Sequence, residues 1–276
     1  MMRKYHFIAG LPRSGSTLLS SILNQNPRFS ASISDPLISY VRSIVQKTDP
    51  ASGMHTLVPV STQKRIMHAI VDAYYANHNQ VCFNTNRSWS AHTELIHDLY
   101  PQARIILCVR HVCWILDSFE RLHTQTPYAL KSVYGNQDLP TVYHRAHSLM
   151  DVNSGGSAIV GMSLLNTKQA LYSAQQSQIC VIDYDVLCAH PDQVMRSLYD
   201  FLDEPMYDHD YSDVATQYDM YDEALNMSGL HRVRSKVEKH ARTSILPDDL
   251  WHTYETECFW HENFDHIKNK VKWWAS

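Results

Sequence analysis

Several features that direct a protein to nucleic acid or to a membrane are missing from this 276-residue sequence. The formal net charge is −4, so there is no global basic field, and we do not expect nucleic-acid binding as the main task. No apolar stretch is long enough to span a bilayer. No secretory signal is visible, because a glycine loop interrupts the first apolar run. We therefore expect a cytoplasmic protein without a membrane span.

The cysteines and histidines lack the spacings of disulfide-rich or metal-binding proteins. None of the six cysteines forms a Cys-x-x-Cys pair, and several lie in apolar runs such as "ARIILCVR". This pattern predicts buried free thiols in a reducing compartment. The 17 histidines include close pairs such as His144 and His147, but these lack the partner spacings of a zinc site. We expect no metal site.

What the chain does contain is an alternation of short apolar runs with amphipathic segments. Strands are predicted at 4–10, 81–86, 103–110 and 179–185, and helices at 16–27, 88–100, 114–125, 161–176 and 191–204. This alternation predicts a three-layer α/β fold with a parallel sheet. We expect one domain over 1–276, with a helical insertion at about 36–79, an irregular loop or lid at 126–156, and a C-terminal helical and loop extension at about 206–276.

The segment "GLPRSGSTLL", residues 10–19, stands between the first predicted strand and the first predicted helix. A glycine loop in this position directs several backbone N–H groups, and the positive end of the helix, toward one point. Ser14, Ser16 and Thr17 add hydroxyl groups. The composition predicts a binding site for phosphate or a similar tetrahedral oxyanion, the alternative being a plain strand-to-helix turn.

This loop lacks the lysine that a nucleoside-triphosphate loop carries before its Ser/Thr. Ser16 occupies that position, and Arg13 lies inside the loop instead. A triphosphate loop uses the lysine on the β- and γ-phosphates, and its Mg²⁺ takes a second ligand from an aspartate that follows an apolar strand. For that aspartate, "ICVIDYD" is only an imperfect candidate. Hydrolysis of ATP or GTP is therefore disfavoured.

A second anion signal lies in "ARIILCVRHVCWILDSFERL". Its predicted strand ends in Arg110, and Ser118 follows eight residues later on the next predicted helix. An arginine at the carboxyl end of a parallel strand faces the crevice where α/β folds bind ligands, and the serine can converge on the same anion. The alternative for Arg110 is a surface ion pair.

These segments resemble sulfotransferases that use 3′-phosphoadenosine 5′-phosphosulfate (PAPS). "GLPRSGSTLL" resembles the 5′-phosphosulfate loop of that family, "CVRHVCWILDS" its 3′-phosphate motif, and "VIDYDVLCAHPDQVMRSLYDFLDEP" a later family stretch. The resemblance covers about 5–25, 80–120 and 178–205. It implies a P-loop-like sulfotransferase fold and transfer of a sulfuryl group from PAPS to an acceptor hydroxyl. The product would be adenosine 3′,5′-bisphosphate, and no metal would be required.

The arginine of "PRSGST" is similar to that of tyrosylprotein and carbohydrate sulfotransferases, whereas cytosolic small-molecule enzymes usually carry lysine there. Short bacterial tyrosylprotein-sulfotransferase-like proteins are the most similar overall. The resemblance implies peptide tyrosine as acceptor, with a sugar or a small phenol still open. A P-loop kinase and a non-catalytic nucleotide-binding protein are the competing interpretations. Oligomeric state is not predicted.

The resemblance also implies roles for individual residues. Arg13 would stabilise charge on the leaving phosphate, and Arg110 with Ser118 would hold the 3′-phosphate. Tyr184 would contact the adenosine part, or else is an ordinary tyrosine at the end of the sheet. Backbone N–H groups of the loop would hold the 5′-phosphate, at Ser14, Gly15, Ser16, Thr17 and Leu18. A basic segment would close over the nucleotide, or else is a solvated turn, and consists of Arg232, Arg234 and Lys236.

Two catalytic assignments depart from the family pattern. The tyrosylprotein enzymes have a glutamate just over twenty residues past the loop arginine, and here Asp35 is the only carboxylate near that position, about one residue out of register. Asp35 is equally well interpreted as a helix N-cap before Pro36. The family lysine upstream of the 3′-phosphate motif is missing from "FNTNRSW", where Arg87 is the natural substitute.

Overall fold

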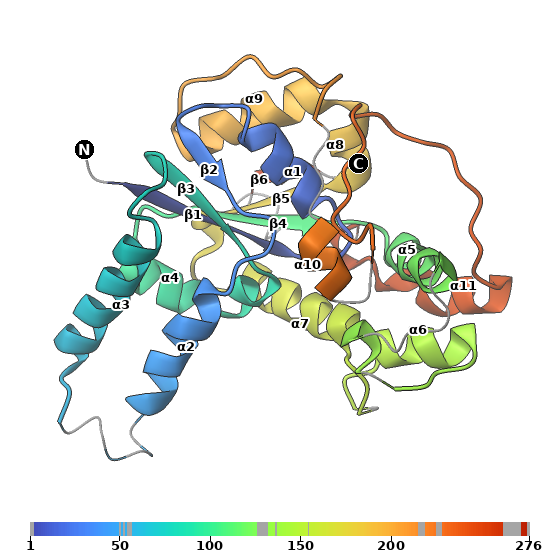
Figure 1. Cartoon of the computed structure of the whole chain (residues 1–276), viewed down its shortest axis with the longest axis horizontal. Helices are drawn as coiled ribbons and strands as arrows, with labels where there is room; N and C mark the ends of the chain where they lie inside the picture. The colour runs from blue at the N-terminus through green and yellow to red at the C-terminus, as the bar shows by residue number, and fades with distance from the viewer. Residues whose placement is uncertain are drawn as a thin grey trace.

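The computed structural model describes residues 3–49, 51, 53, 57–125, 132–135, 137–153, 155–214, 219–224, 228–261 and 272–274. Its centre is a sheet of six described strands with every neighbouring pair parallel (Figure 1). The strands are β1 (Lys4–Gly10), β2 (Phe29–Ala31), β3 (Val81–Thr85), β4 (Ile105–Val109), β5 (Ile179–Asp183) and β6 (Lys272–Trp274). Their order is β2-β3-β1-β4-β5-β6, so the predicted parallel α/β fold is confirmed.

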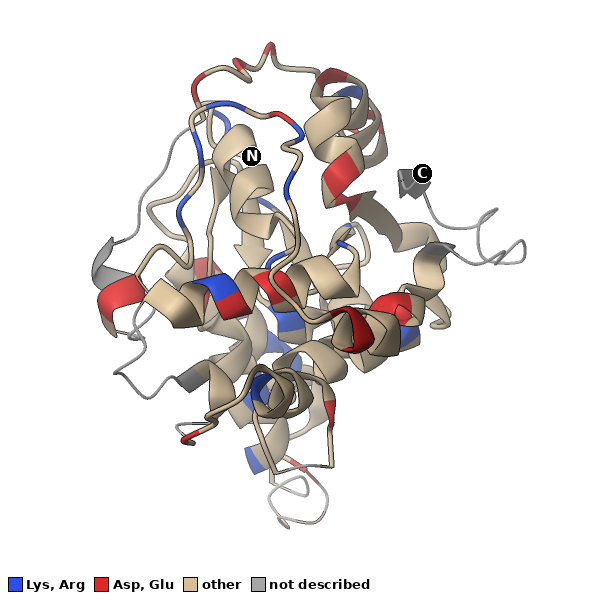
Figure 2. Cartoon of the chain, turned by 90° about the vertical axis from the view of Figure 1, so that its right-hand side faces the viewer, with Lys and Arg blue, Asp and Glu red and all other residues tan. Residues whose placement is uncertain are grey.

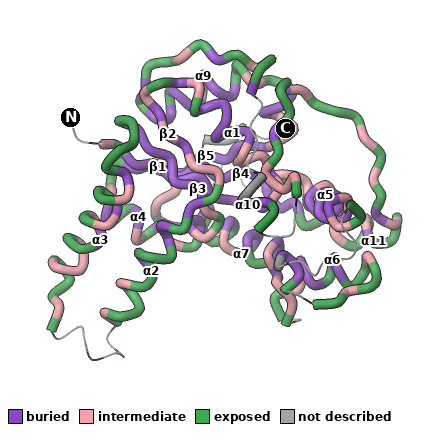
Figure 3. The backbone as a smooth tube through the Cα atoms, viewed as in Figure 1, coloured by how far each residue is buried: buried purple, intermediate pink, exposed green. Residues whose placement is uncertain are grey.

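Helices cover both faces of the sheet because its strands are apolar on both sides. On β1, Tyr5, Phe7 and Ala9 belong to one core cluster and Ile8 to the other. One face packs against α2 (Leu37–Lys47), α3 (Val60–Tyr74), α4 (Thr93–Leu99), α5 (Val112–Gln125), α6 (Val142–Met150), α7 (Ile159–Leu171) and α11 (Asp248–Tyr254). The other packs against α1 (Ser16–Leu23), α8 (Tyr184–Ala189) and α9 (Pro191–Leu202). In Figure 3 the sheet is buried, whereas α2 and α3 expose much of their length.

The order of the strands creates a crevice at the carboxyl ends of β1 and β4. After β1 the chain forms β2 and β3 on one side of β1 in the sheet, and then crosses to form β4 and β5 on the other side of β1. Ligands bind at such a reversal in parallel α/β sheets. Gly10 ends β1 with φ 103°, and Leu11 N–H donates to Cys108 O of β4 at 2.8 Å. The loop that follows β1 is thereby anchored at the mouth of the crevice.

The prediction of an irregular segment at 126–156 is wrong for part of that range, since Val142–Met150 forms α6. Its helical pattern is weak in sequence, but Thr141 caps it by accepting from His144 N–H at 3.2 Å. Arg145 then forms a two-pronged ion pair with Glu120 of α5, at 2.8 and 2.6 Å. Residues 126–131, 136 and 154 of this range lie outside the described part of the chain.

The expected helical insertion contains α2 and α3. All six cysteines are buried and free, as the sequence indicates. Within the described residues, no helix combines the length and the apolarity that crossing a membrane requires. Among the described residues, the ribbon in the view of Figure 2 carries Lys and Arg interspersed with Asp and Glu.

Candidate functional site

A cavity of about 640 Å³ lies at the carboxyl ends of the strands. Segments that follow β1, β3, β4 and β5 line it, together with part of a C-terminal segment, residues 228–246, that we call the strap. Backbone hydrogen bonds fix the strap, with Val214 N–H donating to Ser235 O at 2.7 Å and Val237 N–H to Tyr211 O at 2.8 Å. Val233 and Val237 are buried in the core. The strap is therefore packed onto the domain over the cavity.

The loop after β1 presents backbone donors to this cavity. Leu19 N–H makes the first intrahelical bond of α1, to Gly15 O at 2.9 Å, so the N–H groups of Ser16, Thr17 and Leu18 have no partner within the helix. All three residues line the cavity. Gly15 precedes them at φ 92°, and a Cβ there would lie 2.7 Å from Cδ2 of Tyr184. Glycine allows the loop both its left-handed turn and its contact with the tyrosine ring.

Ser14 is the loop residue whose side chain turns away. Its buried hydroxyl shares one proton between two carbonyl oxygens, Leu11 O at 2.5 Å and Cys108 O at 2.9 Å, and the residue does not line the cavity. These bonds attach the loop to the end of β4. Ser14 therefore sets the shape of the loop through its side chain, whatever its backbone N–H does.

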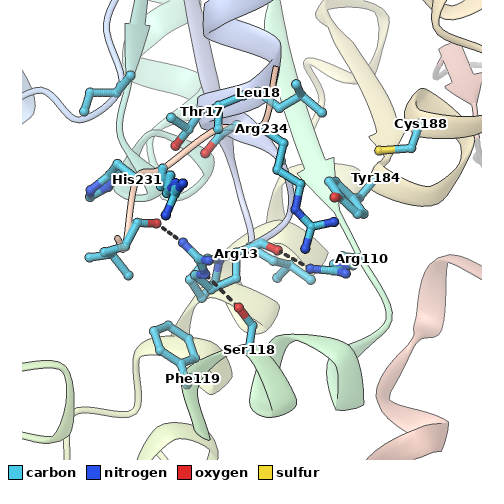
Figure 4. Close-up of a pocket in the computed structure, with 18 of the residues that line it drawn as sticks. Arg13, Thr17, Leu18, Arg110, Ser118, Phe119, Tyr184, Cys188, His231 and Arg234 are labelled. Carbon is cyan, nitrogen blue, oxygen red and sulfur yellow. Dashed lines mark hydrogen bonds between the residues drawn. The ribbon is translucent and has the colours of Figure 1, made fainter. Parts of the chain in front are cut away.

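Arg13 occupies the middle of the cavity (Figure 4). Its Nε donates to Ser118 Oγ of α5 at 3.0 Å, and its Nη1 donates to Leu230 O of the strap. Burial and the nearby Arg110 lower the pKa of Arg13 to about 10, which still leaves it cationic at neutral pH. Arg13 also has a left-handed backbone, with φ 56°. The guanidinium thus joins the loop, α5 and the strap.

Arg110 lies directly after β4, as the sequence predicts. Its guanidinium carbon stands 4.2 Å above the ring of Tyr184, and its Nη1 donates to Arg13 O at 3.3 Å. Its Nε is buried and has no hydrogen-bond partner among the described residues. A buried guanidinium N–H without a partner is costly, so this group is set to receive an anionic oxygen.

The strap adds further cations. Arg232, Arg234 and Lys236, predicted from the basic run, all line the cavity. Sequence analysis missed Arg242, which stacks 4.6 Å above Trp114 and pairs with buried Asp117 at 3.1 Å. The lining cations are Arg13, Arg87, Arg110, Arg232, Arg234, Lys236 and Arg242, and the lining acids among the described residues are Asp185 and Glu238. Such a wall favours a ligand with several negative charges.

The two predicted catalytic groups outside the loop differ in their position relative to the cavity. Arg87 follows β3 and lines the cavity, in a short turn that Asn86 caps by accepting from Ser88 N–H at 3.0 Å. Asp35 is buried and does not line the cavity. Its Oδ1 accepts from Leu37 N–H at 2.9 Å and its Oδ2 from the Tyr75 hydroxyl at 3.4 Å. Its side chain therefore contacts the first residue of α2, while Pro36 occupies the N-cap position of that helix.

A second pair of residues at the cavity has no sequence signal. His231 of the strap lines the cavity, and its Nδ1 lies 2.6 Å from Oδ1 of Asp222. Asp222 belongs to α10 (Asp219–Ala224) and is 1% exposed. No sequence pattern marks this contact, because one residue belongs to α10 and the other to the strap.

The sequence model described as "Sulfotransferase family" matches residues 6–209. Among solved structures, the chain is similar to the sulfotransferase domain from the curacin biosynthetic pathway, at 17% identity and a TM-score of 0.48, over 75% of this chain and 76% of that one. It is also similar to a sulfotransferase from Alicyclobacillus acidocaldarius, at 16% identity and a TM-score of 0.48, over 81% and 90% of the two chains. A comparison with curated proteins found no match.

Proposed function

Because the chain belongs to the sulfotransferase family, we propose that it transfers the sulfuryl group of PAPS to an acceptor hydroxyl, leaving adenosine 3′,5′-bisphosphate. The observation that carries this proposal is the convergence of the α1 N–H groups, Arg13, Arg110 and the strap cations on one cavity. PAPS has a phosphosulfate at one end and a second phosphate on the ribose, which calls for two anion sites side by side. The α1 N-terminus and Arg110 supply two such sites.

In this proposal the N–H groups at the start of α1 hold the 5′-phosphate, while Arg110 and Ser118 hold the 3′-phosphate. The Tyr184 ring, packed against Gly15 and Arg110, provides an apolar surface for the adenosine part. The strap covers the nucleotide with its basic side chains. No step requires a metal ion, since arginines neutralise the charge that Mg²⁺ neutralises in triphosphate enzymes.

Transfer is proposed to proceed in line, with the acceptor oxygen attacking sulfur as the bond to the 5′-phosphate breaks. Negative charge then grows on the bridging oxygen, and preorganised cations at that point lower the barrier. We assign the stabilisation of this charge to Arg13 and Arg87, both of which line the cavity. The planar guanidinium group of an arginine can contact two oxygens of the phosphosulfate at once.

The proposed acceptor is a peptide tyrosine. Its support is the cavity lining, where Ile33, Phe119, Val133 and Ile159 offer apolar surface for an aromatic ring. A small phenol would use the same surface, and a sugar would gain less from it. The test is to measure transfer from labelled PAPS to a tyrosyl peptide, to 4-methylphenol and to a disaccharide, and to compare the three rates.

We further propose that the protein works in a reducing compartment such as the cytoplasm. All six cysteines are buried free thiols. Burial raises the pKa of the Cys108 thiol to about 12, so this thiol is not ionised to the reactive thiolate at neutral pH. Thiols of this kind need no disulfide partner to stabilise the fold.

The donor assignment is tested by binding without magnesium. Calorimetry in EDTA should show tight binding of adenosine 3′,5′-bisphosphate and much weaker binding of ATP, because ATP lacks the 3′-phosphate that Arg110 and Ser118 would hold. Labelled PAPS should then pass its sulfur to an acceptor in the same buffer. Equal affinity for ATP, together with a requirement for Mg²⁺, would refute the proposal in favour of a P-loop kinase.

Replacing Arg110 with alanine should weaken binding of adenosine 3′,5′-bisphosphate by about 10- to 100-fold, the usual value of a charged hydrogen bond. Once the ternary complex forms, kcat should change much less, because the 3′-phosphate assigned to Arg110 does not change its charge during transfer. Arg196→Ala is the matched control, since it also removes one positive charge, from an exposed ion pair on α9. Equal dissociation constants for Arg110→Ala and wild type would remove Arg110 from the donor site.

A further inference from the structure

A hydroxyl attacks sulfur better once a base removes its proton. The carboxylate singled out in the sequence, Asp35, is buried and does not line the cavity, and both its oxygens accept hydrogen bonds. The group that accepts the proton therefore has to be sought among the cavity residues themselves.

The ionisable candidates on the cavity wall differ in their surroundings. Glu238 is paired with Lys236 and lies near the exposed His240. Glu238 and His240 therefore belong to a solvated part of the strap. Asp185 lies in the first turn of α8, next to Tyr184 and hence at the nucleotide end. The side chain of His231 is 15% exposed, against 39% for that of Glu238. His231 also lies beside the loop arginine, because its neighbour Leu230 accepts from Arg13 Nη1 (Figure 4).

Two hydrogen bonds from one buried carboxylate fix His231. Asp222 Oδ1 lies 2.6 Å from Nδ1 of the imidazole, and Oδ2 accepts from the backbone N–H of His231 at 2.8 Å. An ionised carboxylate at Nδ1 keeps the proton on that nitrogen and leaves Nε2 as the basic atom. The carboxylate is almost wholly buried, so this contact is shielded from competing water.

We propose that His231, oriented by Asp222, accepts the proton of the acceptor hydroxyl during sulfuryl transfer. This inference rests on the proposed function and adds the base to it. As the acceptor oxygen forms its bond to sulfur, its proton moves to Nε2 of His231. The S–O bond to the 5′-phosphate breaks, and the leaving phosphate keeps the electron pair. His231 afterwards releases its proton to water, while Asp222 remains ionised throughout.

The charges around His231 suit this role. Burial lowers its pKa below the usual 6.5, Asp222 of α10 opposes that effect, and Arg13 of the loop and Arg87 after β3 lower the pKa further. The imidazole is therefore neutral at pH 7 and ready to take a proton. The same two arginines are those proposed to stabilise the leaving group, so the proposed base and the proposed leaving-group cations line one cavity.

The pH dependence has a definite sign. The active form of His231 is neutral, so kcat/KM should be constant near pH 7 and fall as the pH drops through the lowered pKa of His231, below 6.5. Asp222→Asn removes the interaction that raises this pKa. The acid limb of the profile should therefore move to lower pH in that variant while kcat falls. A merely structural Asp222 would leave the position of the limb unchanged.

The sharpest test compares phenols of different acidity with labelled PAPS. His231→Gln should lower kcat/KM for 4-methylphenol by about 10²- to 10³-fold. The loss should be much smaller for 4-nitrophenol, which ionises readily and needs no base. The Kd for adenosine 3′,5′-bisphosphate should stay within about twofold, if the variant keeps its fold and donor site. His144→Gln, an exposed histidine on α6, is the matched control with unchanged rates.

Each result decides between explanations. An equal loss for both phenols, or no loss, overturns the role of His231 while leaving the proposed function intact. A wild-type protein that binds no bisphosphate and sulfates no acceptor overturns the proposed function itself. Should His231→Gln fail to fold, the wild-type profile decides, because a flat kcat/KM for 4-methylphenol across the acid range also excludes His231 as the base.

Discussion

Replacing Arg13 with alanine is expected to lower kcat about 10³-fold, the effect of removing a preorganised group that meets charge as it develops. Arg13 lies at the point where the loop, α5 and the strap meet, with its Nε 3.0 Å from Ser118 Oγ. Its charge would be used mainly in the transition state, when the bridging oxygen becomes anionic. The Kd for adenosine 3′,5′-bisphosphate should therefore change far less than kcat.

Two further variants separate the charge of Arg13 from its backbone. Arg13→Lys keeps the charge but loses the planar guanidinium group, so an intermediate kcat is expected. Arg13→Gly should be as inactive as Arg13→Ala, yet fold at least as stably, because glycine adopts φ 56° without strain. Single-turnover transfer from labelled PAPS measures kcat, and thermal unfolding measures stability.

The contact of Arg13 with Ser118 of α5 provides the control for an indirect effect. Ser118→Ala removes the hydrogen bond to Nε while keeping the guanidinium and its bond to Leu230 O. This variant should lose donor affinity through the 3′-phosphate site, with a much smaller change in kcat than Arg13→Ala. Equal effects of the two substitutions on kcat would show that Arg13 acts by holding α5 in place, and not on the leaving group.

The central strands were predictable because they are buried on both faces and nearly uniformly apolar. Ile105–Val109 is such a run, and its neighbours β1 and β5 share the same signal. The edge strands β2 and β6 have three residues each and are defined by their partners, so no local pattern marks them. Helix α6 was missed for a similar reason, since the Arg145–Glu120 pair that stabilises it joins residues 25 apart in sequence.

The residues of the candidate site also fall into those that a local sequence pattern marks and those that it does not. Residues that follow a strand directly, such as Arg110 and Tyr184, could be placed from sequence, because parallel strands end at one edge. Arg242 and the His231–Asp222 pair could not, since they reach the cavity through the path of the strap. Asp35 shows the converse limit: an Asp-Pro pair fits a cap and a catalytic carboxylate equally well in sequence. Only its contacts with Leu37 and Tyr75 distinguish the two.

Gly10→Ala is expected to destabilise the fold strongly. At φ 103° an alanine is strained, and its Cβ would lie 2.2 Å from Cys108 O and 2.6 Å from Cys108 N. Both of these atoms are backbone of the central strand β4, which cannot move aside without breaking its pairing with β1 and β5. Strain of about 1–3 kcal/mol and overpacking of about 1–3 kcal/mol together approach the stability of an ordinary domain.

Gly53→Ala isolates the contribution of that close approach. Gly53 also has a positive φ, 71°, but a Cβ there would meet nothing within 4 Å. Urea unfolding followed by circular dichroism should show a loss of about 1 kcal/mol or slightly more for Gly53→Ala, from backbone strain alone. For Gly10→Ala the loss should be several times larger, or the variant should not fold. Similar losses of unfolding free energy for Gly10→Ala and Gly53→Ala would mean that β1 and β4 lie farther apart at the base of the loop than the structure shows. That result would contradict the geometry of the anion site that depends on this contact.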